Sequence, residues 1–262
     1  MSDIFNLVRG NSPLLVSMPH SGESLGPYME RMTDAAHKLT DTDWHLPKLY
    51  AFLADMDVTV IAANHSRYVI DLNRDPSGKS LYPGQNVTEL CPTTTFPEEQ
   101  IYLDGEKPSD EECAERVKTY WEPYHNRIEE ELNRLKAQHG YALLWDAHSI
   151  ASEVPRFFEG NLPDFNLGTN SGASCDSRLG EELLKVAEQF EKYTAVLNGR
   201  FKGGFITRKY GRPEKGVHAV QLELSQITYM EEQFPFAYGN EKAAAVQPCI
   251  KALIETMLEF QG

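Results

Sequence analysis

The sequence predicts an α/β fold, a three-layer sandwich in which helices cover both faces of a central mixed, largely parallel sheet. Two observations support this prediction. Short apolar runs bounded by proline, glycine or polar residues are typical of buried strands, and amphipathic stretches with helical spacing separate these runs along the chain. No repeat, low-complexity tract or linker interrupts the 262 residues, so we expect residues 1–262 to form one domain.

The first part of the chain predicts a strand, a helix and two further strands. Residues 13–19 (PLLVSMP) are an apolar run with proline at both ends, which predicts a buried strand. Helically spaced leucines, with Asp and Thr as caps, predict a helix over residues 40–56. The apolar runs 58–64 and 67–73 predict two strands, and a polar loop then extends from residue 74 to about residue 95.

The second part continues the alternation of helices and strands. A capping box at residues 109–112 opens a charged helix that runs to Gly140, with Pro123 as an expected kink or break. The remaining predicted elements are a strand over 141–149, a loop containing Pro155, Gly160, Pro163 and Gly168, a helix over 177–190, strands over 193–199, 204–211 and 217–225, and a closing helix over 240–260.

Acidic side chains outnumber basic ones, and the formal net charge is −14. A field of this sign repels phosphate, which argues against a nucleic-acid partner and against binding to anionic membrane surfaces. No apolar run is long enough to span a bilayer, and the first ten residues lack the apolar core of an export signal. The four cysteines include no CxxC pair, which argues against a thiolate zinc site and a dense disulfide framework. We therefore expect a cytoplasmic protein.

His20 and Glu23 lie three residues apart, directly after the first predicted strand. An imidazole and a carboxylate at this spacing can converge on a metal, and Gly22 between them lets the backbone turn. A distant His148, near the end of a predicted strand, would complete a His, Glu, His set that leaves one position of a tetrahedral zinc open for water. Because this spacing is common by chance, its place at a strand end carries more weight than the spacing itself.

Two acids accompany the predicted strand ends. Strand alternation puts Asp146 on the same side of the sheet as His148, where it could orient a metal-bound imidazole or form an ordinary buried polar pair. Glu223 lies in an apolar run, where burial would raise its pKa and suit it to act as base and then acid. The alternative is an ordinary glutamate at a strand end.

Basic side chains supply candidate contacts for an anionic substrate. Asn73 and Arg74 follow the apolar run YVIDL, and an arginine there suits bidentate binding of a carboxylate or stabilisation of an oxyanion. A surface ion pair with Asp71 or Asp75 is the alternative. Residues 200–212 place several cations on a glycine-rich turn and strand, which is either a positive region for an acidic substrate or a solvated hairpin.

The ordered motifs VSMPHSGE, DLNRDP, DAHS, FKGGFITRKYGRP and LELS resemble those of the N-formylglutamate amidohydrolase family, over about residues 13–228. More distantly, their order is similar to that of the zinc carboxypeptidases, whose α/β fold the resemblance implies for this chain. It implies one Zn²⁺ per chain, or another divalent metal, bound by His20, Glu23 and His148. The implied reaction is hydrolysis of N-formyl-L-glutamate to formate and L-glutamate in histidine degradation.

The same resemblance implies roles for the other candidate residues. Glu223 would be the general base and acid, and Asn73 with Arg74 would contact a substrate carboxylate or the polarised carbonyl, with Arg74 assisting catalysis. Further carboxylate contacts would come from Arg208, Tyr210 and Arg212. The expected partner is a small anionic N-acyl amino acid.

Two alternative functions remain beside this one. The same metal site could act on another N-acyl amino acid or on the C-terminus of a peptide. A protein of a different class would keep the fold without catalysis and use its acidic surface to recruit a basic partner. Stoichiometric metal and hydrolysis of a formylated amino acid distinguish these alternatives.

Overall fold

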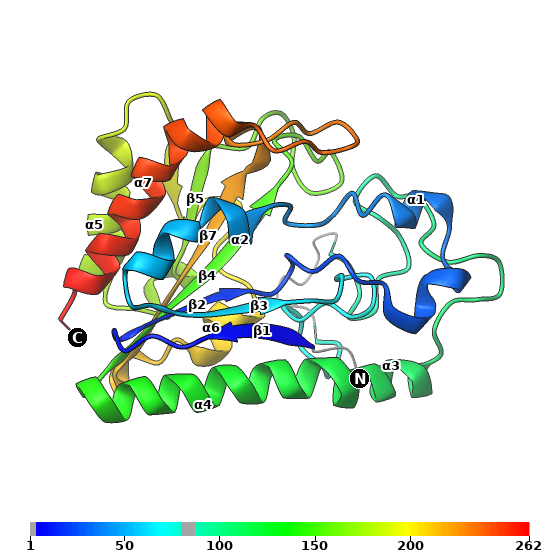
Figure 1. The fold of residues 1–262 in the computed structure, drawn as a ribbon, viewed down its shortest axis with the longest axis horizontal. Helices are drawn as coiled ribbons and strands as arrows, with labels where there is room; N and C mark the ends of the chain where they lie inside the picture. Colours follow the sequence, from blue (N-terminus) through cyan, green and yellow to red (C-terminus); the bar gives the residue numbers. More distant parts are fainter. Residues whose placement is uncertain (1–3, 80–86, 262) are drawn as a thin grey trace.

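The computed structural model describes residues 4–79 and 87–261 of the chain. Within this part, seven strands form one sheet in the order β1, β3, β2, β4, β7, β5, β6. Their bounds are β1 Phe5–Val8, β2 Leu14–Met18, β3 Thr59–Ala63, β4 Ala142–Ile150, β5 Phe165–Gly168, β6 Ala195–Leu197 and β7 Val217–Ser225. The long strands β4 and β7 cross the middle of the molecule side by side (Figure 1).

The sheet is mixed, and its central strands are parallel. β3, β2, β4 and β7 are parallel neighbours, whereas β1 is antiparallel to β3. β5 and β6 are parallel to each other, and β5 is antiparallel to β7. The predicted α/β class with a mixed, largely parallel sheet is therefore confirmed. Because the four central strands run in one direction, their carboxyl ends meet at one edge of the sheet.

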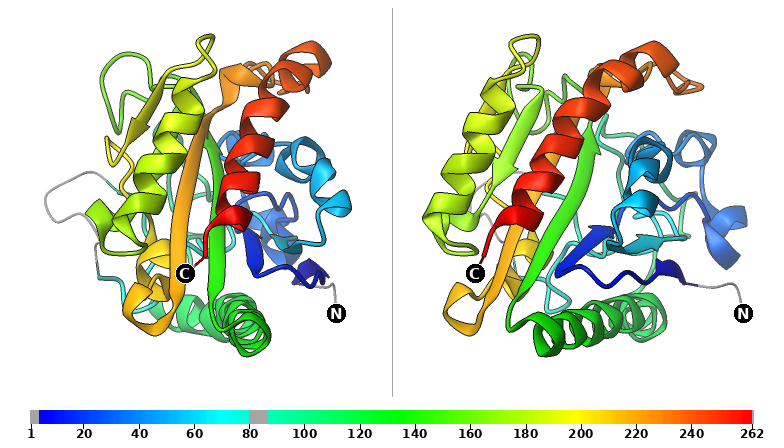
Figure 2. Two further views of the ribbon diagram at one scale, coloured as in Figure 1. Left: turned by 90° about the vertical axis from the view of Figure 1, so that its left-hand side faces the viewer. Right: turned by 60° about the vertical axis from the view of Figure 1, so that its left-hand side comes forward.

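Helices cover both faces of this sheet, as Figures 1 and 2 show. The helix bounds are α1 Asp34–His37, α2 Leu46–Leu49, α3 Asp110–Arg116, α4 Glu122–His139, α5 Ser177–Glu188, α6 Phe205–Tyr210 and α7 Asn240–Glu259. Adjacent residues of β4 pack into opposite layers: Trp145 lies in the core with α2, α5 and α7, and Leu144 in the core with α4 and α6. None of the described helices has the length and apolarity needed to span a bilayer.

The charged helix predicted after residue 109 is largely as expected. Ser109 caps α3 by accepting a hydrogen bond from the Glu112 backbone N–H at 3.2 Å, and Gly140 ends α4 with a φ of +85°. The expected break at Pro123 is wrong. A π-helical turn over Val117–Trp121 joins α3 to α4, so the proline stands in the first turn of α4 without interrupting the helix.

Residues 67–73, predicted as a strand, form a buried turn instead. Side chains from α3 and α4 replace the hydrogen bonds that a neighbouring strand would supply. Arg116 Nη1 donates to the Val69 carbonyl at 2.8 Å, and His125 Nε2 donates to the Leu72 carbonyl at 2.8 Å. The apolar run correctly predicts burial, but it cannot show which groups satisfy the buried backbone.

Residues 204–211, also predicted as a strand, contain helix α6. Two backbone N–H groups at its start find acceptors on distant side chains. The Gly204 N–H donates to Gln221 Oε1 at 2.7 Å, and the Ile206 N–H donates to Asn73 Oδ1 at 2.8 Å. Since Asn73 is 133 residues away in the sequence, no local pattern could reveal this helix start.

The remaining differences concern short elements. β1 and β5 were not predicted, because four residues are too few for alternation to stand out. The helix predicted over residues 40–56 is reduced to α2 and a 3₁₀ turn over Ala51–Asp55. His45 precedes α2 without a side-chain cap, so the acids of the TDTD segment do not cap this helix.

Candidate active site

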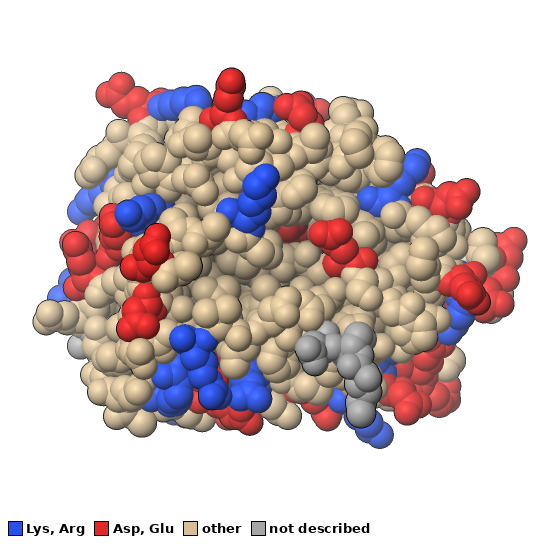
Figure 3. Space-filling view, viewed as in Figure 1, with Lys and Arg blue, Asp and Glu red and all other residues tan. Residues whose placement is uncertain are grey.

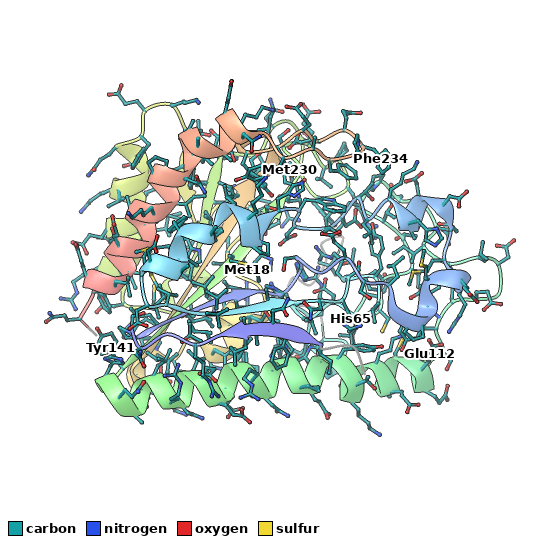
Figure 4. The ribbon with its side chains drawn as sticks, viewed as in Figure 1. Met18, His65, Glu112, Tyr141, Met230 and Phe234 are labelled. Carbon is teal, nitrogen blue, oxygen red and sulfur yellow. The ribbon has the colours of Figure 1, made fainter. Side chains whose placement is uncertain are left out.

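The carboxyl ends of β2, β4 and β7 meet beside a cavity of about 820 Å³. Met18, the last residue of β2, lies near the middle of the molecule (Figure 4), and His20 follows it two residues later. His148 and Glu223 occupy paired positions on β4 and β7, each two residues before the end of its strand. His20, His148 and Glu223 all line the cavity, so the structure brings together three of the predicted site residues.

The His20 imidazole is buried between two aspartates. Its Nε2 lies 2.7 Å from Asp71 Oδ1, and its Nδ1 lies 3.8 Å from Asp43 Oδ2. Burial, together with Arg67, lowers the pKa of His20. Burial alone would raise the pKa of Asp71, but Arg74, His20 and Arg67 hold it well below its ordinary value. A neutral imidazole beside this ionised carboxylate donates from Nε2, which leaves the lone pair of Nδ1 available to a metal.

His148 repeats this arrangement on the neighbouring strand. Its Nδ1 lies 3.1 Å from the same Asp43 Oδ2, and its Nε2 lies 3.2 Å from Asp146 Oδ2. His20, Asp43 and His148 therefore offer three ligand atoms that all lie within 4.8 Å of one another. Two imidazole nitrogens and one carboxylate oxygen are a donor set that zinc takes in catalytic sites.

The charges around this group also fit a bound cation. Asp43 and Asp146 are both buried. Burial alone would lower the pKa of His148, but Asp146 and Asp43 outweigh it and raise this pKa well above its ordinary value. A divalent metal at Nδ1 would supply the positive charge that these two carboxylates favour.

Glu23 does not join this group. Its side chain is exposed and lines a separate cavity of about 540 Å³ between β1, β3 and α2. Gly22 serves a different purpose from the expected turn, because a Cβ there would lie 2.4 Å from the His65 carbonyl oxygen. The carboxylate next to the two histidines is that of Asp43, whose backbone N–H donates to the His20 carbonyl at 3.0 Å.

Glu223 presents a buried carboxyl group next to His148. The pKa of Glu223 is raised to about 8. Burial is the main cause, the charge of Asp43 adds to it, and His148 acts in the opposite direction. Gln221, on the same side of β7, donates from Nε2 to Glu223 Oε2 at 3.4 Å. A carboxyl group that changes protonation near neutral pH is suited to accept a proton and return it.

Asn73 and Arg74 both line the cavity, as predicted, but they make different contacts. Asn73 is buried, with Nδ2 3.0 Å from His148 Nε2, and Gly204 leaves it room because a Cβ there would lie 2.3 Å from Nδ2. Arg74 is about a quarter exposed, and its Nη2 donates to Thr88 Oγ1 at 3.0 Å. Asn73 therefore packs against the His148 imidazole, while Arg74 presents a cation to the cavity.

Two arginines that the sequence analysis did not single out also line the cavity. Arg67 is buried, pairs with Asp71 at 2.6 Å and lies over the Phe96 ring at 4.8 Å. Arg200 precedes α6, and its Nε donates to the Phe157 carbonyl at 2.8 Å. The cluster of cations in residues 200–212 is the sequence feature that could have identified Arg200. Arg67 has no such feature, because it lies in a run that predicts a strand.

Arg212 lies away from the cavity. It is exposed, and its backbone pairs with Val217 at the start of β7. Glu223 is six residues further along this strand, a distance of about 20 Å at the usual rise per residue. The cavity lining within the described residues does not include Arg212.

Arg208 and Tyr210 lie on α6 and, within the described residues, outside the cavity lining. Arg208 Nε donates to the Gly203 carbonyl at 2.8 Å. The Tyr210 hydroxyl lies 2.9 Å from His125 Nδ1, and the other nitrogen of this imidazole holds the Leu72 carbonyl. Tyr210 therefore supports the turn that carries Asn73 and does not reach the cavity itself.

Comparison with known proteins agrees with this geometry. The family model described as N-formylglutamate amidohydrolase matches residues 12–230. The chain is 52% identical to an N-formylglutamate deformylase of Pseudomonas aeruginosa, over 99% of this chain and 98% of that protein. It is 49% identical to an N-formylglutamate deformylase of Pseudomonas putida, over 99% and 97% of the two chains. The crystal structure of an N-formylglutamate amidohydrolase from Ralstonia eutropha superposes with a TM-score of 0.81 at 25% identity, over 98% of this chain and 97% of that one.

Proposed function

Because this chain belongs to the N-formylglutamate amidohydrolase family, we propose that it hydrolyses N-formyl-L-glutamate to formate and L-glutamate with one bound zinc ion. The sequence is 52% and 49% identical to two N-formylglutamate deformylases over nearly the whole chain, which supports this choice of substrate. The observation that carries the proposal is the group of His20, Asp43 and His148 beside Glu223, in a cavity lined by arginines.

His20, Asp43 and His148 would hold the metal in this proposal. Asp43 replaces Glu23 in the predicted ligand set, because Glu23 lies in a different cavity. Asp71 and Asp146 would fix the two rings by hydrogen bonding to their Nε2 atoms. When bound, a divalent metal supplies Lewis acidity, which polarises a carbonyl group and lowers the pKa of water.

Glu223 would move the proton of the reaction. Its carboxylate takes a proton from the water whose oxygen adds to the formyl carbon, and it gives that proton to the nitrogen as the C–N bond breaks. The burial that raises its pKa supports this role, because the protonated form must persist until the amine departs. Formate and the free amino group of glutamate are the products.

Arginines would position the substrate and compensate its charge. Arg74 presents its guanidinium to the cavity beside Asn73 and is the proposed partner of the carbonyl oxygen as that oxygen gains charge. Arg200 is the proposed partner of a substrate carboxylate, in place of Arg212. Arg208 and Tyr210 would contribute through α6, which supports Asn73 through the Ile206 hydrogen bond.

The cellular setting is part of the same proposal. All four cysteines are free thiols, which supports a reducing compartment such as the cytoplasm. The reaction releases glutamate from a formylated precursor, and we place it in histidine degradation, as the sequence resemblance implies. The proposed partner is the anionic substrate, with neither nucleic acid nor membrane taking part.

Formate release from N-formyl-L-glutamate tests this function directly. Purified protein is assayed as isolated, after chelation and after zinc restoration, and N-formyl-L-leucine, N-acetyl-L-glutamate and a dipeptide serve as comparison substrates. We expect chelation to abolish formate release and zinc to restore it. A zinc-loaded protein that cleaves a comparison substrate and not N-formyl-L-glutamate would refute the substrate, and a protein without stoichiometric metal or hydrolysis would favour the binding-protein alternative.

A further inference from the structure

Cys91 and Cys113 are in contact in the wall of the candidate cavity. A side-chain hydrogen bond joins the thiols of Cys91 and Cys113. Both residues belong to one apolar cluster, and both line the cavity that contains His20 and Glu223. Cys113 lies on α3 directly after Glu112, which Figure 4 shows near one end of the molecule.

The two thiols differ in exposure. Cys91 is buried, and burial raises the pKa of its thiol, with the hydrogen bond to Cys113 adding to this effect. Cys113 is only partly buried, so a small reagent in the cavity reaches it first. Cys175 and Cys249 are free thiols in the opposite core, between the sheet and helices α5 and α7. The chain therefore contains one dithiol at the cavity and two buried thiols that serve as internal references.

We propose that Cys91 and Cys113 form a modification site, a dithiol that hydrogen peroxide converts into an intrachain disulfide. The Cys113 thiolate attacks one peroxide oxygen, the O–O bond breaks, and Cys113 becomes a sulfenic acid as the first water leaves. The Cys91 sulfur then loses its proton and attacks the Cys113 sulfur, and the S–O bond breaks to release the second water. In total the two thiols lose two protons and two electrons, and peroxide is reduced to two waters.

This disulfide is coupled to the candidate metal centre through the backbone. Its two sulfurs must approach from hydrogen-bonding distance to about 2.0 Å, which moves the segment that carries Cys91. The neighbouring Leu90 carbonyl accepts a hydrogen bond from the Asp71 N–H at 2.7 Å, and Asp71 in turn holds the His20 imidazole. Disulfide formation therefore disturbs the orientation of His20.

Peptide mapping tests the site without reference to any substrate. The metal-loaded protein is treated with hydrogen peroxide, its remaining thiols are alkylated in denaturant, and its peptides are analysed by mass spectrometry without reduction. We expect the peptides of Cys91 and Cys113 to be joined, with the loss of two hydrogens, and to separate on treatment with dithiothreitol. Cys175 and Cys249 should be alkylated as before. A Cys113 sulfinic acid without a cross-link, or peroxide-treated protein in which Cys91 and Cys113 both remain alkylatable, would overturn the proposal.

The coupling to catalysis rests on the proposed function and is measured separately. Formate release from N-formyl-L-glutamate should fall along the same time course as cross-linking and recover with dithiothreitol. The Cys113→Ser variant, normalised to its own rate before treatment, should show neither the cross-link nor a dithiothreitol-reversible loss. If this variant does not fold, the matched comparison is Cys91→Ser. A complete cross-link with an unchanged rate would disprove the coupling to Asp71.

Discussion

At the scale of single residues, the hydrogen-bond partners of each histidine nitrogen define the candidate centre. The Nε2 atoms of His20 and His148 face Asp71 and Asp146, while both Nδ1 atoms face Asp43. Rings fixed in this way are oriented before a metal arrives, so less conformational entropy is lost on binding. In the proposed site, the two outer aspartates would raise metal affinity without being ligands.

Replacement of Glu223 by Gln tests the role of its carboxyl group. The amide keeps the shape of the side chain but cannot take up a proton, so we expect a fall in kcat of roughly 10²- to 10⁴-fold. Metal content, measured by elemental analysis, should remain that of the wild type because Glu223 is not a proposed ligand. A near-normal kcat in this variant would rule out Glu223 as the proton carrier.

Replacement of Arg200 by Gln tests which arginine binds the side-chain carboxylate of the substrate. A charge-assisted hydrogen bond contributes about 1.5–3 kcal/mol, so kcat/KM for N-formyl-L-glutamate should fall roughly 10- to 150-fold. The value for N-formyl-L-leucine, which lacks that carboxylate, should change little.

Arg212→Gln is the matched control, because Arg212 is exposed at the far end of β7. It should leave kcat/KM for both substrates near the wild-type values. An equal loss for both substrates in Arg200→Gln would show that Arg200 maintains the loop through its bond to Phe157 and does not select the substrate.

The sequence predicted two residues of the candidate metal centre, His20 and His148, because each lies at or near the end of an apolar run. Asp43 was missed because its place beside His20 depends on a backbone hydrogen bond between two segments that share no strand or helix. Asp43 also stands shortly before a helical pattern, where an aspartate is typical of a helix cap. Glu23 had the correct spacing, but a spacing does not specify the direction of a side chain.

At the scale of elements, the buried turn over residues 67–73 carries much of the site. It supplies Arg67, Asp71 and Asn73, and Arg74 follows it directly. Side chains of α3 and α4 donate hydrogen bonds to two of its carbonyl groups. The strands of the central sheet were predictable because burial on both faces gives continuous apolar runs. The sequence of this turn is also largely apolar, so it predicts a strand as well.

His125 makes the stability of this arrangement depend on pH. Burial lowers its pKa to about 3, with the Leu72 carbonyl raising and Lys209 lowering it. The unfolded chain therefore binds this proton at a higher pH than the folded one, so stability is fully present above about pH 6.5 and falls as the pH drops towards 3. The expected slope from this one group is about 1.4 kcal/mol per pH unit.

Urea denaturation of wild type and His125→Gln between pH 6.5 and 4 isolates this contribution. The free energy of unfolding should fall less steeply with decreasing pH in the variant than in the wild type. The difference between the two slopes should be about that of one titrating group. His37→Gln is the control, because His37 is exposed and its replacement should leave the wild-type slope unchanged. Parallel pH profiles for wild type and His125→Gln would show that His125 is not held neutral in the folded state.

At the scale of the whole molecule, an acidic protein has to admit an anionic substrate. The net charge is −14, and Figure 3 shows acidic side chains gathered at the end of the molecule that carries α1 and α3. The described lining of the cavity instead includes Arg67, Arg74, Arg200 and Lys79 alongside its acids. A local group of cations can attract a small anion even where the total charge repels it.

The central claim is that His20, Asp43 and His148 hold a catalytic metal, and metal content compared across two carboxylate variants tests it most directly. Asp43→Asn and Glu23→Gln are each loaded with zinc, freed of excess metal by gel filtration and assayed for bound zinc and for formate release. We predict that Asp43→Asn loses both stoichiometric zinc and activity, whereas Glu23→Gln keeps one zinc per chain and a near-normal rate. Loss of zinc in Glu23→Gln with retention in Asp43→Asn would contradict this account.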